Sequence, residues 1–216
     1  MEGLDCQIDY WNRFGPTKSF HHPVNLKRLA QWAAPDDRIL DYGCGYGRVL
    51  GLLHSQGYRN LVGVDPASAM IAEGRRRHPP IRFEHLSDPP NLGLPAASVG
   101  AVLLFTVLTC VPTDDGQRAI IREVGRVLRP GGLLYISDLW LQTDARNVQR
   151  YVRGHPKYGT YGIFDLAEGV TVRHHDPKWI ELLTAGYRAV GLDTLEVETM
   201  NGHAASGFQW FGVKPA

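Results

Sequence analysis

The fold is decided by the stretch Ile39-Leu40-Asp41-Tyr42-Gly43-Cys44-Gly45-Tyr46-Gly47-Arg48. Its three glycines stand between a short apolar run, which predicts a strand, and a segment that predicts a helix. Because glycine has no Cβ, the backbone can turn sharply there and can come within contact distance of a ligand. The helix that follows offers free N–H groups at its start. The stretch therefore predicts a ligand site at a strand-to-helix turn.

The residues around the glycines narrow the class of ligand. A dinucleotide site requires Gly-x-Gly-x-x-Gly, and Arg48 occupies the position of the third glycine. Asp41 precedes the first glycine by two residues, where an acid suits a cationic group and opposes a pyrophosphate. Asp65 stands at the end of the next predicted strand, in a position to bind both hydroxyls of a ribose. A ribose with a nearby cation and no phosphates describes S-adenosylmethionine.

Strands and helices alternate on both sides of this turn. Short apolar runs predict parallel strands at 38–42, 60–65, 81–86, 98–108 and 133–138. Helical spacing and capping residues predict helices at 24–33, from the glycine turn to 57, and at 67–78, 113–128 and 177–187. Two alternating runs, 192–200 and 207–213, flank Asn201-Gly202 and predict an antiparallel hairpin that closes the sheet. This order predicts an α/β fold with helices on both faces of the sheet.

Four segments in this order resemble the class I S-adenosylmethionine-dependent methyltransferases. They are DYGCGYG at 41–47, GVD at 63–65, SVGAVLLFTVLTCVP at 98–112 and REVGRVLRPGGLLYISD at 122–138. The resemblance covers residues 38–138. It implies a Rossmann-like, seven-stranded, mostly parallel sheet whose last strand is antiparallel, in agreement with the predicted hairpin. It also implies S-adenosyl-L-methionine as cofactor and S-adenosyl-L-homocysteine as product.

The resemblance further implies roles for individual residues. Asp41 would orient the methionine amino group, and Asp65 would take the ribose hydroxyls. Gly43 and Gly45 would let the backbone pass beneath the methionine portion. The other cofactor-binding residues that the resemblance implies, in the glycine turn and beside the adenine and the sulfonium, are Tyr42, Cys44, Tyr46, Gly47, Pro66, Ser87 or Asp88, and Phe105.

Simpler interpretations of the same residues stay open on the sequence alone. Asp41 and Asp65 are residues that also cap turns, and Asp88 precedes Pro89-Pro90, where a turn is expected. Phe105 is equally compatible with a place in the apolar core. The sequence therefore gives a cofactor site whose adenine end is less well defined than its ribose end.

Two segments lie outside the alternating pattern and are expected to cover the site. Ligands of open α/β sheets bind beyond the carboxyl ends of the strands, and the N-terminal segment 1–34 and the insertion 139–175 are free to reach that edge. Both carry histidines, which suit a base that removes a proton from the methyl acceptor. The candidate catalytic residues, all also compatible with solvated or capping roles, are His21, His22, His174, His175 and Asp138.

The composition of the chain excludes several classes of function. The 216 residues carry a formal net charge of +1, so no general electrostatic case for nucleic-acid binding exists. Cys6, Cys44 and Cys110 are too few and too far apart for a disulfide framework, and no metal-ligand spacing is present. The N-terminus lacks the apolar core of a signal peptide, and no run approaches the roughly 18 to 20 apolar residues of a membrane helix. A cytoplasmic protein is expected.

The residues and the resemblance together predict a methyltransferase that acts on an O, N or S atom of a small molecule. The motifs of enzymes that methylate DNA adenine or cytosine are missing around Phe105 and Cys110. The stretch 142–178 has six Arg or Lys against four Asp or Glu, a mild hint of a polar or anionic substrate. The alternatives are an enzyme for a protein or tRNA and a non-catalytic partner subunit. One domain is expected, with 38–138 as cofactor-binding core and 177–213 completing the sheet.

Overall fold

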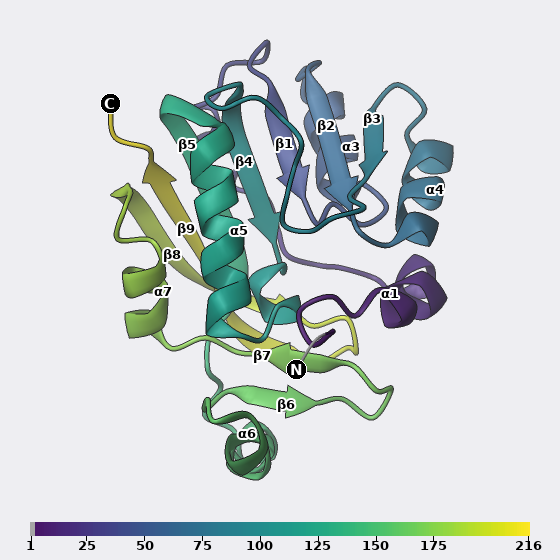
Figure 1. The fold of residues 1–216 in the computed structure, drawn as a ribbon, viewed down its shortest axis with the longest axis vertical. Coiled ribbons are helices and arrows are strands. Elements are labelled where there is room, and N and C mark those ends of the chain that lie inside the picture. The colour runs from purple at the N-terminus through teal and green to yellow at the C-terminus, as the bar shows by residue number, and fades with distance from the viewer. Residues whose placement is uncertain (1–2) are drawn as a thin grey trace.

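The computed structural model describes residues 3–216, which form one seven-stranded sheet and one two-stranded sheet. The large sheet has the order β3-β2-β1-β4-β5-β9-β8 (Figure 1). Its strands are β1 (Ile39–Tyr42), β2 (Leu61–Asp65), β3 (Arg82–His85), β4 (Val99–Phe105), β5 (Leu128–Leu139), β8 (Arg188–Glu198) and β9 (Ala204–Val213). Strands β1 to β5 are parallel to one another, whereas β9 is antiparallel to both β5 and β8. The predicted sheet with an antiparallel last strand is confirmed.

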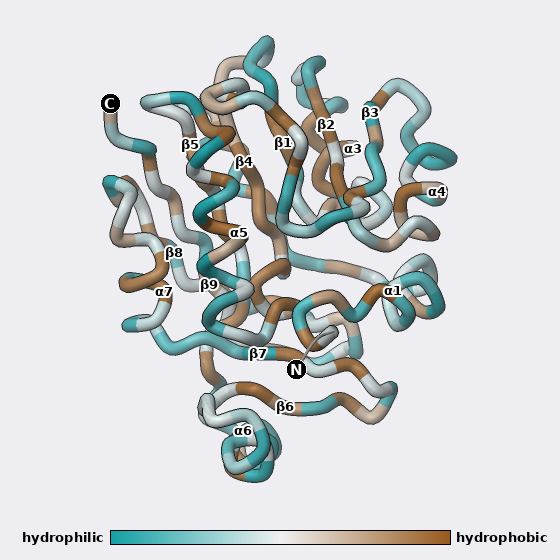
Figure 2. Tube along the Cα trace, viewed as in Figure 1, coloured by the Kyte–Doolittle hydropathy of each residue, from teal (hydrophilic) through white to brown (hydrophobic). Residues whose placement is uncertain are grey.

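Helices cover both faces of this sheet because successive residues of its central strands point to opposite sides. On β1, Leu40 joins a core cluster with α5 (Asp114–Val127), and Ile39 joins a second cluster with α3 (Arg48–Ser55). The strands β1, β2 and β4 are buried at every position, as their uninterrupted apolar runs predict. Figure 2 shows the hydrophobic residues along these central strands. The remaining predicted helices are α4 (Ser68–Arg77) and α7 (Pro177–Leu183).

The N-terminal segment is less regular than its spacing predicts. It contains α1 (Ile8–Phe14), a 3-10 turn η1 (Gly15–Thr17) and α2 (Leu26–Leu29). The helix expected over 24–33 is thus a single turn, capped by the Asn25 side chain, which accepts a bond from the Arg28 N–H. After it the N–H groups of residues 31 and 32 bond three residues back, so the chain tightens into turns.

The insertion after β5 folds into elements that the sequence pattern does not predict. It contains α6 (Ala145–Tyr158) and a two-stranded antiparallel sheet of β6 (Ile163–Asp165) and β7 (Thr171–Arg173). Gln7 joins this sheet to the N-terminal segment, because its side chain bonds both the N–H and the C=O of Thr171, at 2.6 and 2.7 Å. Figure 1 shows α1, β6 and β7 beyond the carboxyl ends of β1, β2 and β4.

The strand ends also differ by a few residues from the predicted bounds. The apolar run 98–108 leaves the sheet at Phe105, and a second 3-10 turn, η2 (Leu108–Cys110), follows it. Strand β8 begins at Arg188, four residues before the predicted start, because it pairs with β9 along its full length. Within residues 3–216, no helix is both long and apolar enough to cross a membrane.

A close helix-to-strand contact generates the first prediction. At Gly154 of α6, an added Cβ would lie 2.0 Å from the Ile163 carbonyl oxygen at the start of β6. We expect Gly154→Ala to lower the free energy of unfolding by about 1–3 kcal/mol, since the helix must move away from the strand. Gly186→Ala is the control, because no atom lies within 4 Å of its added Cβ. Urea unfolding of both variants tests this, and equal stability would contradict the contact.

Candidate functional site

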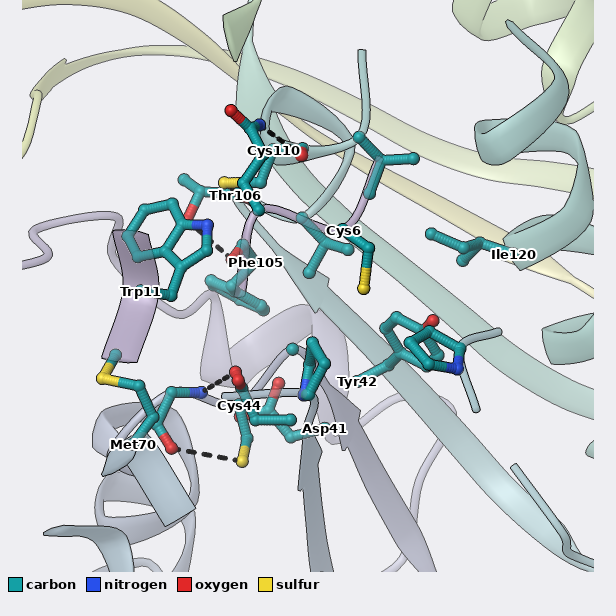
Figure 3. Close-up of a pocket in the computed structure, with 18 of the residues that line it drawn as sticks. Cys6, Trp11, Asp41, Tyr42, Cys44, Met70, Phe105, Thr106, Cys110 and Ile120 are labelled. Atoms are coloured by element: carbon teal, nitrogen blue, oxygen red, sulfur yellow. Dashed lines mark hydrogen bonds between the residues drawn. The ribbon is translucent and has the colours of Figure 1, made fainter. Parts of the chain in front are cut away.

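A cavity of about 290 Å³ lies at the carboxyl ends of β1, β2 and β4. The N-terminal segment lines one side of it, and Figure 3 shows Cys6 and Trp11 across this space from Asp41. Most of the cofactor-binding residues expected from the sequence come together here. Those that line the cavity are Asp41, Tyr42, Gly43, Cys44, Gly45, Tyr46, Asp65, Pro66 and Phe105.

The glycine turn has the left-handed backbone that its residues predict. Gly43, Gly45 and Gly47 have φ of 69°, 55° and 80°. A Cβ on Gly43 would come within 2.7 Å of the Val107 side chain, so only glycine fits without a shift. Gly47 does not line the cavity. An added Cβ there would lie 2.4 Å from the ring of Phe83, so this glycine lets the start of α3 pack against β3.

Asp65 joins the turns after β1 and β2. Its Oδ2 accepts a hydrogen bond from the Gly45 N–H at 2.9 Å, and its Oδ1 accepts one from the Ala67 N–H at 2.8 Å. Burial raises the pKa of this carboxyl to about 6, and the two N–H donors oppose the rise. Each carboxylate oxygen can accept a further bond. The side chain therefore fixes the loop and still offers acceptors to a pair of hydroxyls in the cavity.

Asp41 is a buried carboxyl without a partner. It is 1% exposed, and no hydrogen bond within residues 3–216 uses its carboxylate, of which Oδ1 is fully enclosed. Burial raises its pKa to about 8; the Arg48 guanidinium lowers it and the Asp65 charge raises it. A buried charge is costly unless it is paired. A cationic group that enters the cavity would supply that pairing. The two carboxylates, Asp41 and Asp65, therefore fit S-adenosyl-L-methionine, which carries an amino group, a sulfonium and a ribose diol.

A smaller cavity of about 90 Å³ adjoins the first. The two share lining residues from the N-terminal segment and from the turn after β4: Trp11, Phe20, His22, Thr106 and Cys110. The insertion supplies much of the remaining wall, including Arg146, Arg150, Phe164 and His174. The segments expected to cover the site thus line a second space beside the first.

His22 lies at the junction of the two cavities. It is 3% exposed, its Nδ1 lies 3.0 Å from Ser137 Oγ, and its enclosed Nε2 has no hydrogen-bond partner among residues 3–216. Burial, with a smaller contribution from the charge of Arg48, lowers its pKa to about 4. The imidazole is therefore neutral near pH 7 and has one nitrogen left for a ligand.

The other histidine and acid candidates occupy different places. His174 and His21 line the smaller cavity, and the exposed His21 faces Glu198 at 3.5 Å. His175 and Asp138 are fully buried and line neither cavity. The Asp138 carboxylate accepts the N–H groups of Thr109 and Leu139, and His175 contacts Gln117 and the Leu139 carbonyl.

Two of the three residues expected at the adenine, Ser87 and Asp88, lie away from the larger cavity. Both are exposed. The next two residues, Pro89 and Pro90, do line it. Asp88 instead accepts bonds from Asn91, its backbone carbonyl from the N–H at 2.8 Å and its carboxylate from the side-chain amide at 3.5 Å.

Sequence reasoning missed Thr106. It lines both cavities and has φ of 55°, a left-handed backbone that is strained for a β-branched residue. Its N–H donates to the Ser137 carbonyl at 2.8 Å, which holds this conformation. No sequence signal marks it beyond its place after a strand.

All three cysteines, Cys6, Cys44 and Cys110, line the larger cavity. Burial raises the pKa of each thiol and leaves it protonated.

Comparisons with known proteins agree with this geometry. Residues 39–132 match the family described as a methyltransferase domain. A demethylmenaquinone methyltransferase from Beutenbergia cavernae is 33% identical over 183 residues, which cover 76% of this chain and 70% of that protein. A probable S-adenosylmethionine-dependent methyltransferase from Mycolicibacterium smegmatis is 35% identical over 132 residues, 61% of this chain and 46% of that protein. The chain thus spans about half the length of the latter relative.

Solved structures include a similar fold. The crystal structure of a SAM-dependent methyltransferase from Methanosarcina mazei superposes with a TM-score of 0.82 and 25% sequence identity. The superposition covers 87% of this chain and 97% of that one. The structural similarity therefore extends beyond residues 39–132, the part of the chain that matches the family.

The unpartnered Asp41 generates a prediction about pH. Its folded pKa, about 8, lies above its ordinary value of 3.8. Between these values the unfolded chain loses a proton that the folded chain keeps, so stability falls as pH rises, by up to about 1.4 kcal/mol per pH unit. Asp41→Asn removes this dependence. We therefore expect the stability of the variant relative to the parent to increase from pH 5 to pH 7 in urea unfolding without cofactor. Parallel pH profiles would contradict the burial of a protonated Asp41.

Proposed function

The chain belongs to the class I S-adenosylmethionine-dependent methyltransferases, and from this premise we propose that it methylates an O, N or S atom of a small molecule. The cofactor of this family, S-adenosyl-L-methionine, supplies an electrophilic methyl group when it is bound. The observation that carries the proposal is the pair of adjoining cavities. One contains the carboxylates that suit the cofactor, and the other lies beside it and could hold the methyl acceptor.

The larger cavity supplies the groups that would hold the cofactor. We assign the ribose hydroxyls to Asp65 and the amino group to Asp41, whose carboxylate has no partner within residues 3–216. Gly43 and Gly45 would leave room beneath the methionine portion, and Phe105 would lie beside it. At the adenine end, Pro66 lines the cavity and keeps the adenine contact expected from the sequence. The exposed Asp88 is replaced in this proposal by Pro89 and Pro90, which line the cavity.

The smaller cavity supports a small acceptor of polar or anionic character. Its volume is about 90 Å³, and its walls come mainly from the N-terminal segment, the insertion and the turns beside them. Its lining combines aromatic rings with histidines and two arginines. An acceptor enclosed in this way is held against the junction with the larger cavity, and positioning of this kind accounts for much of the rate of a direct displacement.

His22 is the proposed contact for the reacting atom of the acceptor. When its Nδ1–H donates to Ser137 Oγ, its enclosed Nε2 carries a lone pair that has no partner within residues 3–216. That lone pair would accept a hydrogen bond from the O–H, N–H or S–H of the acceptor and orient its nucleophilic electrons. Burial also excludes water from this point, which protects the transferred methyl group from hydrolysis.

Calorimetric titration with S-adenosyl-L-methionine and S-adenosyl-L-homocysteine tests the cofactor assignment. We expect both to bind, and Asp65→Asn to weaken the binding of each at least about tenfold, because an amide cannot accept the same set of hydrogen bonds. Asp115→Asn is the matched control, since Asp115 is exposed and lines neither cavity. Absence of binding by the parent protein, or equal affinities of the two variants, would contradict the assignment.

A transfer experiment tests the class of acceptor. The protein is incubated with methyl-labelled S-adenosyl-L-methionine and total cell extract, and the products are separated by ultrafiltration. We expect a labelled product other than S-adenosyl-L-methionine in the small-molecule filtrate, and we expect the amount of this product to fall with Asp65→Asn but not with Asp115→Asn. Label retained with protein or RNA would instead favour a macromolecular acceptor.

A further inference from the structure

We propose that the smaller cavity binds a compact acceptor that carries a carboxylate, paired with Arg150 and Arg146, while the reacting atom points toward His22. The inference rests on the proposed function, because it assigns the acceptor to the cavity beside the cofactor site. It goes further by naming the charged group of the acceptor and the residues that would recognise it.

Arg150 is a partly buried cation without a counter-ion. Within residues 3–216, its guanidinium forms no ion pair with a carboxylate, and the ion pair of the neighbouring Asp144 is with Arg146. One of its N–H groups donates to Asn147 Oδ1 at 3.2 Å, and the guanidinium lies 5.2 Å from the centre of the Phe164 ring. A guanidinium has five N–H donors, so most of these are free for a ligand in the cavity that Arg150 lines. These two contacts fix its position without neutralising its charge.

Arg146 adds a second positive charge that is only weakly balanced. Its Nε lies 3.9 Å from Asp144 Oδ1. The Asp144 carboxylate is already used by Asn147, whose backbone and side-chain N–H groups it accepts at 3.1 and 2.6 Å at the start of α6. The only carboxylate among the cavity's lining residues is Glu198, which is exposed and faces His21. Among the residues that line the cavity, the two guanidiniums and this one carboxylate leave a net charge of +1, which matches a monoanion.

His174 supplies a neutral donor to the same wall. The Tyr151 oxygen accepts the Gln142 N–H at 3.0 Å and lies 2.6 Å from His174 Nδ1. The Tyr151 proton then has His174 Nδ1 as its acceptor, which leaves the imidazole proton on Nε2. Burial lowers the pKa of His174 to about 3, so the ring stays neutral. No hydrogen bond within residues 3–216 uses this Nε2, and His174 lines the cavity.

The positions of these groups orient the acceptor. Arg146, Arg150 and His174 belong to the insertion, whereas His22 lies at the junction with the cofactor cavity. The apolar part of the wall includes the aromatic and methionine side chains of Trp11, Phe20, Phe164 and Met200. A flat apolar body about the size of one ring would lie among them. The carboxylate would then point to the insertion and the nucleophile to His22.

Titration with matched acids and amides tests this orientation. The probes are 4-hydroxybenzoate against 4-hydroxybenzamide and phenylacetate against phenylacetamide, with S-adenosyl-L-homocysteine present and absent. We expect each acid to bind about tenfold or more tightly than its amide, since a hydrogen-bonded ion pair is gained. We expect Arg150→Gln to remove this preference. Arg153→Gln, on the exposed face of the same helix, should behave as the parent.

The outcomes separate this inference from the proposed function. Binding of S-adenosyl-L-homocysteine without any preference for the acids would overturn the carboxylate site and leave the cofactor assignment intact. The same conclusion follows if neither acid shows saturable binding, if Arg150→Gln keeps the preference, or if phenyl phosphate binds more tightly than the acids. If the protein preferred the acids but did not bind S-adenosyl-L-homocysteine, the result would support the anion site and contradict the proposed methyl transfer. Melting curves of each variant confirm that it is folded.

Discussion

The site depends on one carboxylate, that of Asp65. By accepting the N–H groups of Gly45 and Ala67, it ties the turn after β1 to the turn after β2 at the carboxyl edge of the sheet. The parallel register of β1 and β2 brings these turns together, since Asp41 pairs with Gly63 and Tyr42 with Val64. A side chain with both oxygens fixed in this way can present acceptors to a ligand with little loss of conformational entropy.

The same region carries groups that the protein alone does not satisfy. Asp41 Oδ1 and His22 Nε2 are enclosed without partners in the described part of the chain, and Thr106, which lines both cavities, has a strained backbone. Each of these features costs stability, and together they lie where a cationic cofactor and a nucleophilic acceptor are proposed to meet. Binding of the two ligands would offset the costs, which is the reason such groups are tolerated in one small region.

The sequence predicts the core well because its signals are local. The glycine turn, Asp65 and the apolar runs of the central strands need only neighbouring residues to be recognised, and their places in the sheet agree with the structure. The insertion and the smaller cavity depend on distant pairs, such as Gln7 with Thr171 and His22 with Ser137, which no local pattern encodes. Arg150 lies on an ordinary helix, and only its lack of a counter-ion marks it. The exposed position of Asp88 likewise follows from the path of the chain before Pro89 and Pro90.

The central claim is that cofactor and acceptor meet at the junction of two cavities. A crystal structure with bound S-adenosyl-L-homocysteine tests this most directly. The account predicts the ribose hydroxyls on Asp65, the amino group beside Asp41, and the sulfur facing the opening to the smaller cavity, near His22 and Thr106. A sulfur turned away from that opening, or a ligand bound outside the larger cavity, would contradict it.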